Sequence, residues 1–224
     1  MSKKLIEVAC FGNQGRSPIA ELALKNLLAN GINGQYQGLS DEYEIISSGV
    51  GVDDIKTGNI PTSVQVKYVK QALDRGDIYT SELEAEHVKK AIEKGDARAI
   101  DICYNKAVDR FGSEEKKFRK EVLPNLGLEG KLKETQEQTT PNKNVVAFFA
   151  MDQRGLDAAR KKYADALIPE PQIMAVLGPY VGSPEVTNTF GNSKAVYKQG
   201  ASQIMKDAEF ALDRVVNETY KKAV

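Results

Sequence analysis

The sequence CFGNQGRS at residues 10–17, together with the segments on either side of it, decides the fold of this chain. The five residues before it, LIEVA, are mostly apolar and predict a buried strand. The residues after it favour a helix, with Ser17 as its cap and Pro18 in its first turn. A strand, a glycine-containing loop and a helix start direct backbone N–H groups at one point, so the stretch predicts an anion site. One face of the expected helix is apolar and comprises Ala20, Ala23, Leu24, Leu27 and Leu28.

Side chains in this loop add chemistry to the anion site. Cys10 precedes N–H donors at a helix N-terminus, an environment that favours ionisation of a thiol. Arg16 follows after five residues and supplies a planar group that can hold two oxygens of a phosphate. Gly12 and Gly15 let the backbone turn around an oxyanion, and Asn13 tolerates the left-handed conformation that such loops need. The spacing Cys-x5-Arg-Ser therefore indicates nucleophilic attack on phosphorus through a phosphocysteine.

Residues 8–28, VACFGNQGRSPIAELALKNLL, closely resemble the active-site loop and first helix of low-molecular-weight protein tyrosine phosphatases. The pattern of that family is hydrophobic-Cys-x-Gly-Asn-x-x-Arg-Ser-Pro-x-Ala-Glu, and every fixed position is met. The resemblance implies that Cys10 is the nucleophile, Arg16 clamps the phosphate and Ser17 stabilises the leaving thiolate. It implies that the phosphate-binding residues are Phe11, Gly12, Asn13 (which also shapes the loop), Gln14, Gly15 and Arg16.

Later segments follow the same pattern in order. Residues 43–48 and 144–151 are predicted as the second and third strands, and residues 171–180 resemble the fourth strand of the family and its exit. We therefore predict an α/β fold, with a doubly wound four-stranded parallel sheet and helices on both faces. The whole chain, residues 1–224, is expected to form a single phosphatase-like domain with its site at the carboxyl edge of the first strand.

Several polar residues are expected to support this frame. Ser48, at the end of the second strand, could hydrogen-bond into the loop. Asp152 matches a Met-Asp pair of the family and is predicted to cap the helix after the third strand, with no catalytic role. Ser193 is predicted to cap a long final helix.

Residues 68–122 depart from the family pattern. They show repeated helical periodicity, with glycines at 76, 95 and 112 as predicted breaks between helices. We expect a helical insertion over about 68–122.

The insertion holds three features with ordinary structural interpretations. His87, the only histidine, has no companions at metal-ligand spacing and is expected at a solvent-exposed edge. Cys103 lies on an apolar stripe and is expected as a small core residue. The charged run 114–120 has mixed sign and is predicted to lie on a solvated helical face.

One catalytic part of the family pattern is missing. The loop before the final helix normally carries an aspartate that protonates the leaving group, and here Asn188 occupies that position. An amide cannot give a proton in this way, and loss of a general acid typically costs about a hundred- to ten-thousand-fold in rate. Either Glu185 or an acid from the insertion takes over, or the leaving group needs no acid, or the pocket binds phosphate and turns over slowly.

The sequence thus favours a cysteine-dependent phosphatase that hydrolyses phosphomonoesters, with phosphotyrosine as the expected substrate. Two alternatives stay open. The same fold and loop serve thioredoxin-coupled arsenate reductases, which need further thiols, whereas Gly15 stands where many members carry a second cysteine. A catalytically weak module that binds phosphate or a phosphoprotein is the other alternative, because of Asn188.

Composition sets the remaining expectations. The chain has 224 residues with 31 basic and 31 acidic side chains, so neither nucleic acid nor a membrane is expected as a partner. Two cysteines, one of them a thiolate nucleophile, fit a reducing cytoplasm. The expected partners are a phosphorylated protein or a small phosphomonoester, with inorganic phosphate as product or inhibitor. No metal and no cofactor is expected, because the loop supplies the electrostatics.

Overall fold

The computed structural model describes residues 3–31, 39–128, 130–178 and 185–220. Its centre is a four-stranded parallel sheet in the order β2-β1-β3-β4. The strands are β1 (Lys4–Cys10), β2 (Tyr43–Gly49), β3 (Val145–Ala150) and β4 (Ile173–Val176). The predicted α/β sheet is confirmed, and β4 lies within residues 171–180, the range expected to hold the fourth strand and its exit; residues 179–180 lie outside the described part of the chain.

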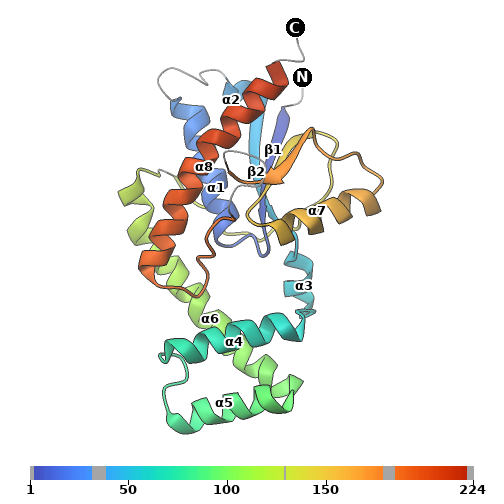
Figure 1. Cartoon of the computed structure of the whole chain (residues 1–224). Helices are drawn as coiled ribbons and strands as arrows, with labels where there is room; N and C mark the ends of the chain where they lie inside the picture. Colours follow the sequence, from blue (N-terminus) through green and yellow to red (C-terminus); the bar gives the residue numbers. More distant parts are fainter. Residues whose placement is uncertain (1–2, 32–38, 129, 179–184, 221–224) are drawn as a thin grey trace.

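Helices cover both faces of this sheet (Figure 1). On one face, Ile6 and Val8 of β1 share a core with α1 (Arg16–Asn30) and α8 (Lys194–Tyr220). On the other face, Ala9 shares a core with α7 (Gln153–Asp165). The alternation follows from the strand geometry, since successive side chains point to opposite faces.

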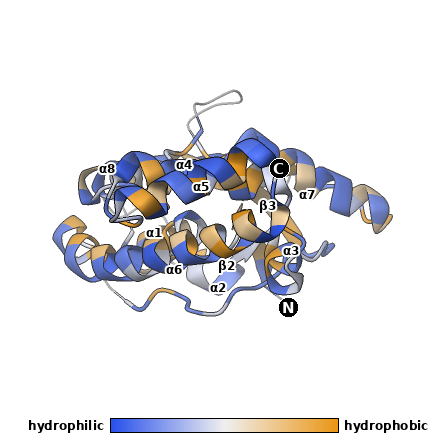
Figure 2. Cartoon of the chain, turned by 90° about the horizontal axis from the view of Figure 1, so that it is seen from below, coloured by the Kyte–Doolittle hydropathy of each residue, from blue (hydrophilic) through white to orange (hydrophobic). Residues whose placement is uncertain are grey.

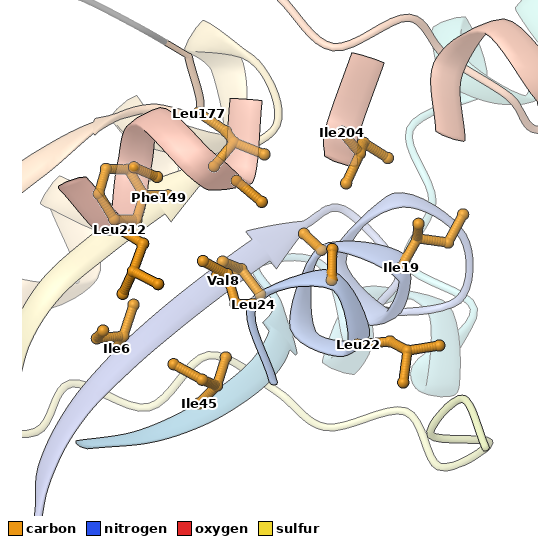
Figure 3. Close-up of a cluster of buried hydrophobic side chains, with 14 of the residues drawn as sticks. Ile6, Val8, Ile19, Leu22, Leu24, Ile45, Phe149, Leu177, Ile204 and Leu212 are labelled. Atoms are coloured by element: carbon orange, nitrogen blue, oxygen red, sulfur yellow. The ribbon is translucent and has the colours of Figure 1, made fainter. Parts of the chain in front are cut away.

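The larger of these cores is built from aliphatic side chains and Phe149, which come from the strands and from α1 and α8 (Figure 3). Ile19 and Leu24 of α1 pack there beside Ile204 and Leu212 of α8, and all four are fully buried. Burial of this area anchors α1, so the loop ahead of α1 has a fixed support at both ends.

Short elements join these layers. They are α2 (Leu39–Glu42), α3 (Val52–Thr57) and the 3-10 turn η1 (Pro124–Leu126). Ser193 caps α8 as predicted, because its hydroxyl accepts from the N–H of Val196 at 3.4 Å.

Three helices between α3 and η1 extend away from the sheet (Figure 1). They are α4 (Thr62–Arg75), α5 (Glu82–Lys94) and α6 (Ala97–Val122). The first begins at Thr62, earlier than the expected start at residue 68. They share a separate cluster that includes Val69, Val88 and Phe111. Each of the three carries both hydrophilic and hydrophobic residues (Figure 2), as expected of helices that bury one side only. That they form an insertion stays a prediction.

The predicted break at Gly112 is wrong. Gly76 and Gly95 follow α4 and α5 in left-handed conformation, but α6 runs without interruption through Gly112. A glycine within a helix costs about 1 kcal/mol relative to alanine. Packing offsets this cost, because the first half of α6 lies in the α4–α5 cluster and Val122 at its end lies in the core of the sheet.

The other expectations for this segment are met in part. His87 is exposed on α5. Cys103 is half-buried against the cluster of the three helices and is not a fully buried core residue.

Within the described part of the chain, no helix has the length and apolar character needed to cross a membrane.

A buried carboxyl on the central strand makes stability depend on pH. Glu7 is 2% exposed, its Oε1 accepts from the hydroxyl of Ser48, and its Oε2 has no hydrogen-bond partner. Burial raises the pKa of Glu7 from 4.5 to about 7, against the opposing effects of Ser48 and Lys133. Between these two pH values the folded chain holds a proton that the unfolded chain has released, so stability falls as the pH rises through this window.

We predict that Glu7→Gln makes the free energy of unfolding less dependent on pH between pH 5 and 8. The variant should gain up to about 3 kcal/mol over the parent at pH 8 and much less at pH 5, because the amide carries no charge to bury. Urea unfolding at the two pH values measures this difference. Glu44→Gln, at an exposed position on β2, is the matched control and should keep the parental slope. An unchanged slope in Glu7→Gln would contradict the assignment.

Candidate functional site

The loop between β1 and α1 lies at the carboxyl edge of the sheet, as predicted. Cys10 is the last residue of β1 and is 6% exposed, and α1 begins at Arg16. Asn13 has a φ of 48°, in the left-handed region that the sequence predicted for it. The chain therefore turns sharply at Asn13, and the N-terminus of α1 lies close to the end of β1.

The hydroxyl of Ser17 contacts the sulfur of Cys10. Its Oγ lies 3.1 Å from Sγ of Cys10, 3.0 Å from Oδ1 of Asn13 and 3.1 Å from the carbonyl oxygen of Ser48. Ser17 is completely buried and lies inside α1, whose capping position is Gly15, so the predicted capping role is wrong. The hydroxyl is instead available to the thiol, which is the contact that the resemblance implies.

Hydrogen bonds to its backbone carbonyls connect the loop to the residues after β2 and to the segment before β3. The N–H of Val50 donates to the carbonyl of Cys10 at 3.0 Å, and the N–H of Gly51 donates to that of Phe11 at 2.9 Å. The amide of Gln136 donates to the carbonyl of Gly12 at 3.0 Å. These three bonds hold the carbonyls of Cys10, Phe11 and Gly12 in fixed positions.

Ser48 acts differently from the sequence expectation. Its backbone carbonyl accepts a hydrogen bond from the hydroxyl of Ser17. Its own hydroxyl donates to the carboxyl of Glu7 and lies 2.8 Å from Oγ1 of Thr139. Ser47 also contacts the loop through its carbonyl, which accepts from the side chain of Asn13 at 3.2 Å. The end of β2 thus supports the loop through its main chain.

Arg16 is held by an ion pair that sequence reasoning missed. One nitrogen of its guanidinium lies 2.8 Å from Oδ2 of Asp152, and another donates to the carbonyl of Val186 at 3.1 Å. The other oxygen of Asp152 accepts from the N–H of Gly155 at 2.8 Å, which confirms the predicted cap of α7. The signal was present in the sequence, because Asp152 follows a strand whose carboxyl end meets the same sheet edge as the loop.

The residues at the expected acid position have other partners. The carbonyl of Asn188, which is half-buried, accepts from the side chain of Asn192 at 3.0 Å. Glu185 is exposed, and its carboxylate accepts from the N–H of Gln153 at 2.9 Å, at the start of α7. The structure therefore gives Glu185 a supporting role at that helix.

Glu115 of α6 corrects the expectation for the charged run 114–120. It is 3% exposed, and its carboxyl lies against the loop at Gly15. Its Oε1 accepts from the hydroxyl of Thr189 at 3.2 Å, and its Oε2 is 3.8 Å from Arg119. Burial raises the pKa of Glu115, while Arg119, Thr189 and Arg16 act in the opposite direction.

Tyr68 of α4 brings a second part of the helical segment to the site. Its ring contacts Phe190 edge to face at 5.6 Å, and Phe190 contacts Phe111 in the same way at 5.7 Å. Burial raises the pKa of Tyr68, and the charges of Arg16, Cys10 and Glu115 are close enough to affect it. The segment 62–122 therefore contributes side chains around the loop.

A groove opens beside the loop, between α6 and residues 130–136. Gln14 and Glu115 form part of its wall. Its cationic side chains outnumber the anionic ones, so the groove favours negatively charged groups. The cationic residues are Lys56, Lys116, Arg119, Lys120, Lys131 and Lys133, and the anionic ones are Asp109, Glu115 and Glu134.

In the described ranges, His, Cys, Asp and Glu form no group of three or more suited to a metal ion.

The fold is that of the low-molecular-weight phosphatases. A protein tyrosine phosphatase from Entamoeba histolytica, solved with Hepes in its active site, is 16% identical, with 98% of this chain and 99% of that chain covered and a TM-score of 0.54. The arginine phosphatase DARP of Drosophila is 19% identical over 95% of this chain and 97% of its own, with a TM-score of 0.51.

A low-molecular-weight phosphotyrosine phosphatase from Vibrio cholerae is 13% identical over 99% of both chains, with a TM-score of 0.50. No protein-family model and no curated protein matches the sequence. At these identities the likeness establishes the fold alone, and it confirms the fold that the loop resemblance implied.

We predict that Asp152→Asn weakens the site with little effect on folding. Asparagine caps helices as well as aspartate does, but it lacks the charge that holds Arg16. A charge-assisted hydrogen bond contributes about 1.5–3 kcal/mol, so the affinity for inorganic phosphate should fall at least about tenfold. Calorimetric titration measures the affinity, and Asp157→Asn on the exposed side of α7 is the control. Tighter phosphate binding in Asp152→Asn would show that Asp152 competes with the anion.

Proposed function

We propose that this chain is a cysteine-dependent phosphatase that hydrolyses phosphomonoesters, with phosphotyrosine as its substrate class. The observation that carries the proposal is the hydroxyl of Ser17 at 3.1 Å from the sulfur of Cys10, at the start of a helix. This contact places a hydrogen-bond donor on the sulfur that acts as nucleophile in the proposed mechanism. The fold shared with solved phosphatases supports the same conclusion.

In the proposed first step, a phosphate monoester occupies the loop, with its oxygens on the backbone N–H groups from Phe11 to Arg16. The guanidinium of Arg16, held in place by Asp152, binds two of these oxygens. The thiolate of Cys10 attacks phosphorus, the S–P bond forms and the ester P–O bond breaks. Positioning and electrostatic stabilisation supply most of the rate enhancement in such a transfer.

In the second step, water attacks the phosphorus of phosphocysteine and inorganic phosphate leaves. The sulfur departs as a thiolate, which the hydroxyl of Ser17 stabilises. The partners that suit this chemistry are a phosphorylated protein or a small phosphomonoester, with inorganic phosphate as product and competitive inhibitor. We place the reaction in a reducing cytoplasm, because a thiolate nucleophile needs to stay reduced.

Arsenate reduction is less compatible with the positions of the thiols. That reaction needs a second cysteine near Cys10, whereas position 15 is a glycine that faces the carboxyl of Glu115. The other thiol, Cys103, lies against the cluster of α4, α5 and α6. These positions favour hydrolysis.

We predict that Cys10→Ser abolishes hydrolysis of p-nitrophenyl phosphate and keeps phosphate binding, because the loop remains while the nucleophile is lost. Steady-state rates and a calorimetric titration with inorganic phosphate measure the two properties. Cys103→Ala is the matched control and should keep the parental rate. If Cys10→Ser hydrolyses the ester as fast as the parent, the phosphocysteine mechanism is wrong. If the parent binds phosphate without hydrolysing any ester, the chain is a phosphate-binding module.

A further inference from the structure

The proposed mechanism still lacks a proton donor for the leaving group. Asn188 occupies the position at which the family resemblance places an acid, and an amide has no proton to give to a departing oxygen. We infer that Glu115, on α6, protonates the leaving group. This inference rests on the proposed phosphatase function and adds one catalytic residue to it.

The carboxyl of Glu115 occupies space that a side chain at position 15 would otherwise fill. A Cβ added to Gly15 would lie 2.5 Å from Oε1 of Glu115 and 3.3 Å from its Cδ. Real Cβ atoms do not approach other atoms as closely as 2.5 Å, so a larger residue at position 15 would have to displace the end of the Glu115 side chain. Since Gly15 directly precedes Arg16, the carboxyl lies beside the residues proposed to surround the phosphate.

Glu115 is also connected to the loop in which the family carries its acid. The hydroxyl of Thr189, the residue after Asn188, donates to Oε1 of Glu115 at 3.2 Å. The carboxyl is thus bounded by the phosphate loop on one side and by the expected acid loop on the other. Although only 3% exposed, it forms part of the wall of the groove that reaches Gln14.

The surroundings of Glu115 favour its protonated form. Burial raises its pKa, against Arg119 of the same helix, Thr189 and Arg16 of α1. Two further ionisable groups face it from other helices, Tyr68 of α4 and Tyr197 of α8. A raised pKa keeps the proton in place at a pH at which an ordinary carboxyl would have lost it, which is the state that a general acid needs.

The proton balance of the reaction is then complete. As the P–O bond breaks, the proton of the Glu115 carboxyl passes to the departing oxygen, and the carboxylate that remains faces Arg119 at 3.8 Å. In the second step the carboxylate takes a proton from the water that attacks phosphorus. The S–P bond breaks, inorganic phosphate and the Cys10 thiolate are released, and Glu115 is protonated again.

Two other carboxyls near the loop suit this role less, because one is paired with Arg16 at 2.8 Å and the other is exposed. Asp152 uses one oxygen on Arg16 and the other on the N–H of Gly155. Glu185 is exposed and accepts from the N–H of Gln153. Glu115 therefore fits the role best among these three.

The decisive experiment compares leaving groups in Glu115→Gln. The amide has the shape of the protonated acid but cannot transfer its proton, so kcat/KM for phenyl phosphate should fall about a hundred- to ten-thousand-fold. The loss for p-nitrophenyl phosphate should be smaller, because p-nitrophenolate departs readily without protonation. The alkaline limb of the pH–rate profile should disappear. A purely structural role would lower both rates equally and leave the profile unchanged, and that result would overturn the inference.

Two further variants complete the design. Glu114→Gln changes the neighbouring carboxyl, which pairs with Arg75 and Arg110, and should match the parent on both substrates. Glu115→Asp keeps a proton to donate and should recover part of the phenyl phosphate rate lost in Glu115→Gln, and this comparison still holds if the amide destabilises the fold. Loss in Glu114→Gln equal to that in Glu115→Gln, or no recovery in Glu115→Asp, would contradict the inference.

The same measurements separate this inference from the proposed function. If the parent shows no hydrolysis that depends on Cys10, the phosphatase proposal fails as a whole. If hydrolysis depends on Cys10 and Glu115→Gln behaves as the parent does, only the assignment of the proton donor is wrong. In that case, a gain for phenyl phosphate in Asn188→Asp would locate the vacant acid position in the loop before α8.

Discussion

The buried hydroxyl of Ser17 is the contact on which the arrangement of the site depends. It has one proton and three neighbours within hydrogen-bond distance, namely the sulfur of Cys10, the side chain of Asn13 and the carbonyl of Ser48. The proton is drawn most strongly to a charged acceptor, so ionisation of the thiol would direct it to the sulfur. A single group thus fastens the end of β1, the loop and the end of β2, and responds to the charge of the nucleophile.

Much of this site follows from local sequence, and for that reason it could be predicted. The turn of the loop depends on the left-handed conformation of Asn13, and α1 begins three residues later, at Arg16. The third strand could be predicted because a central parallel strand is apolar on both faces, and the fourth followed from the family resemblance. The capping roles of Asp152 and Ser193 involve partners only three residues away.

The features that sequence reasoning missed depend on contacts between distant segments. The run around Glu115 alternates in charge like a solvated surface, and only the path of α6 past the loop brings this one carboxyl against Gly15. The ion pair of Asp152 with Arg16 spans 136 residues. Gly112 has the signature of a helix end, but packing at both ends of α6 outweighs its low helix propensity.

The contact between Gly15 and Glu115 has an evolutionary consequence. A larger residue at position 15 overlaps the carboxyl, and a smaller residue at position 115 leaves the hydroxyl of Thr189 without that acceptor and a void beside the loop. The two positions share one space, so we expect the effects of substitutions at them to be non-additive. Among homologues of this chain, a cysteine at position 15 therefore requires that a glutamate at position 115 turn its carboxyl away from the loop.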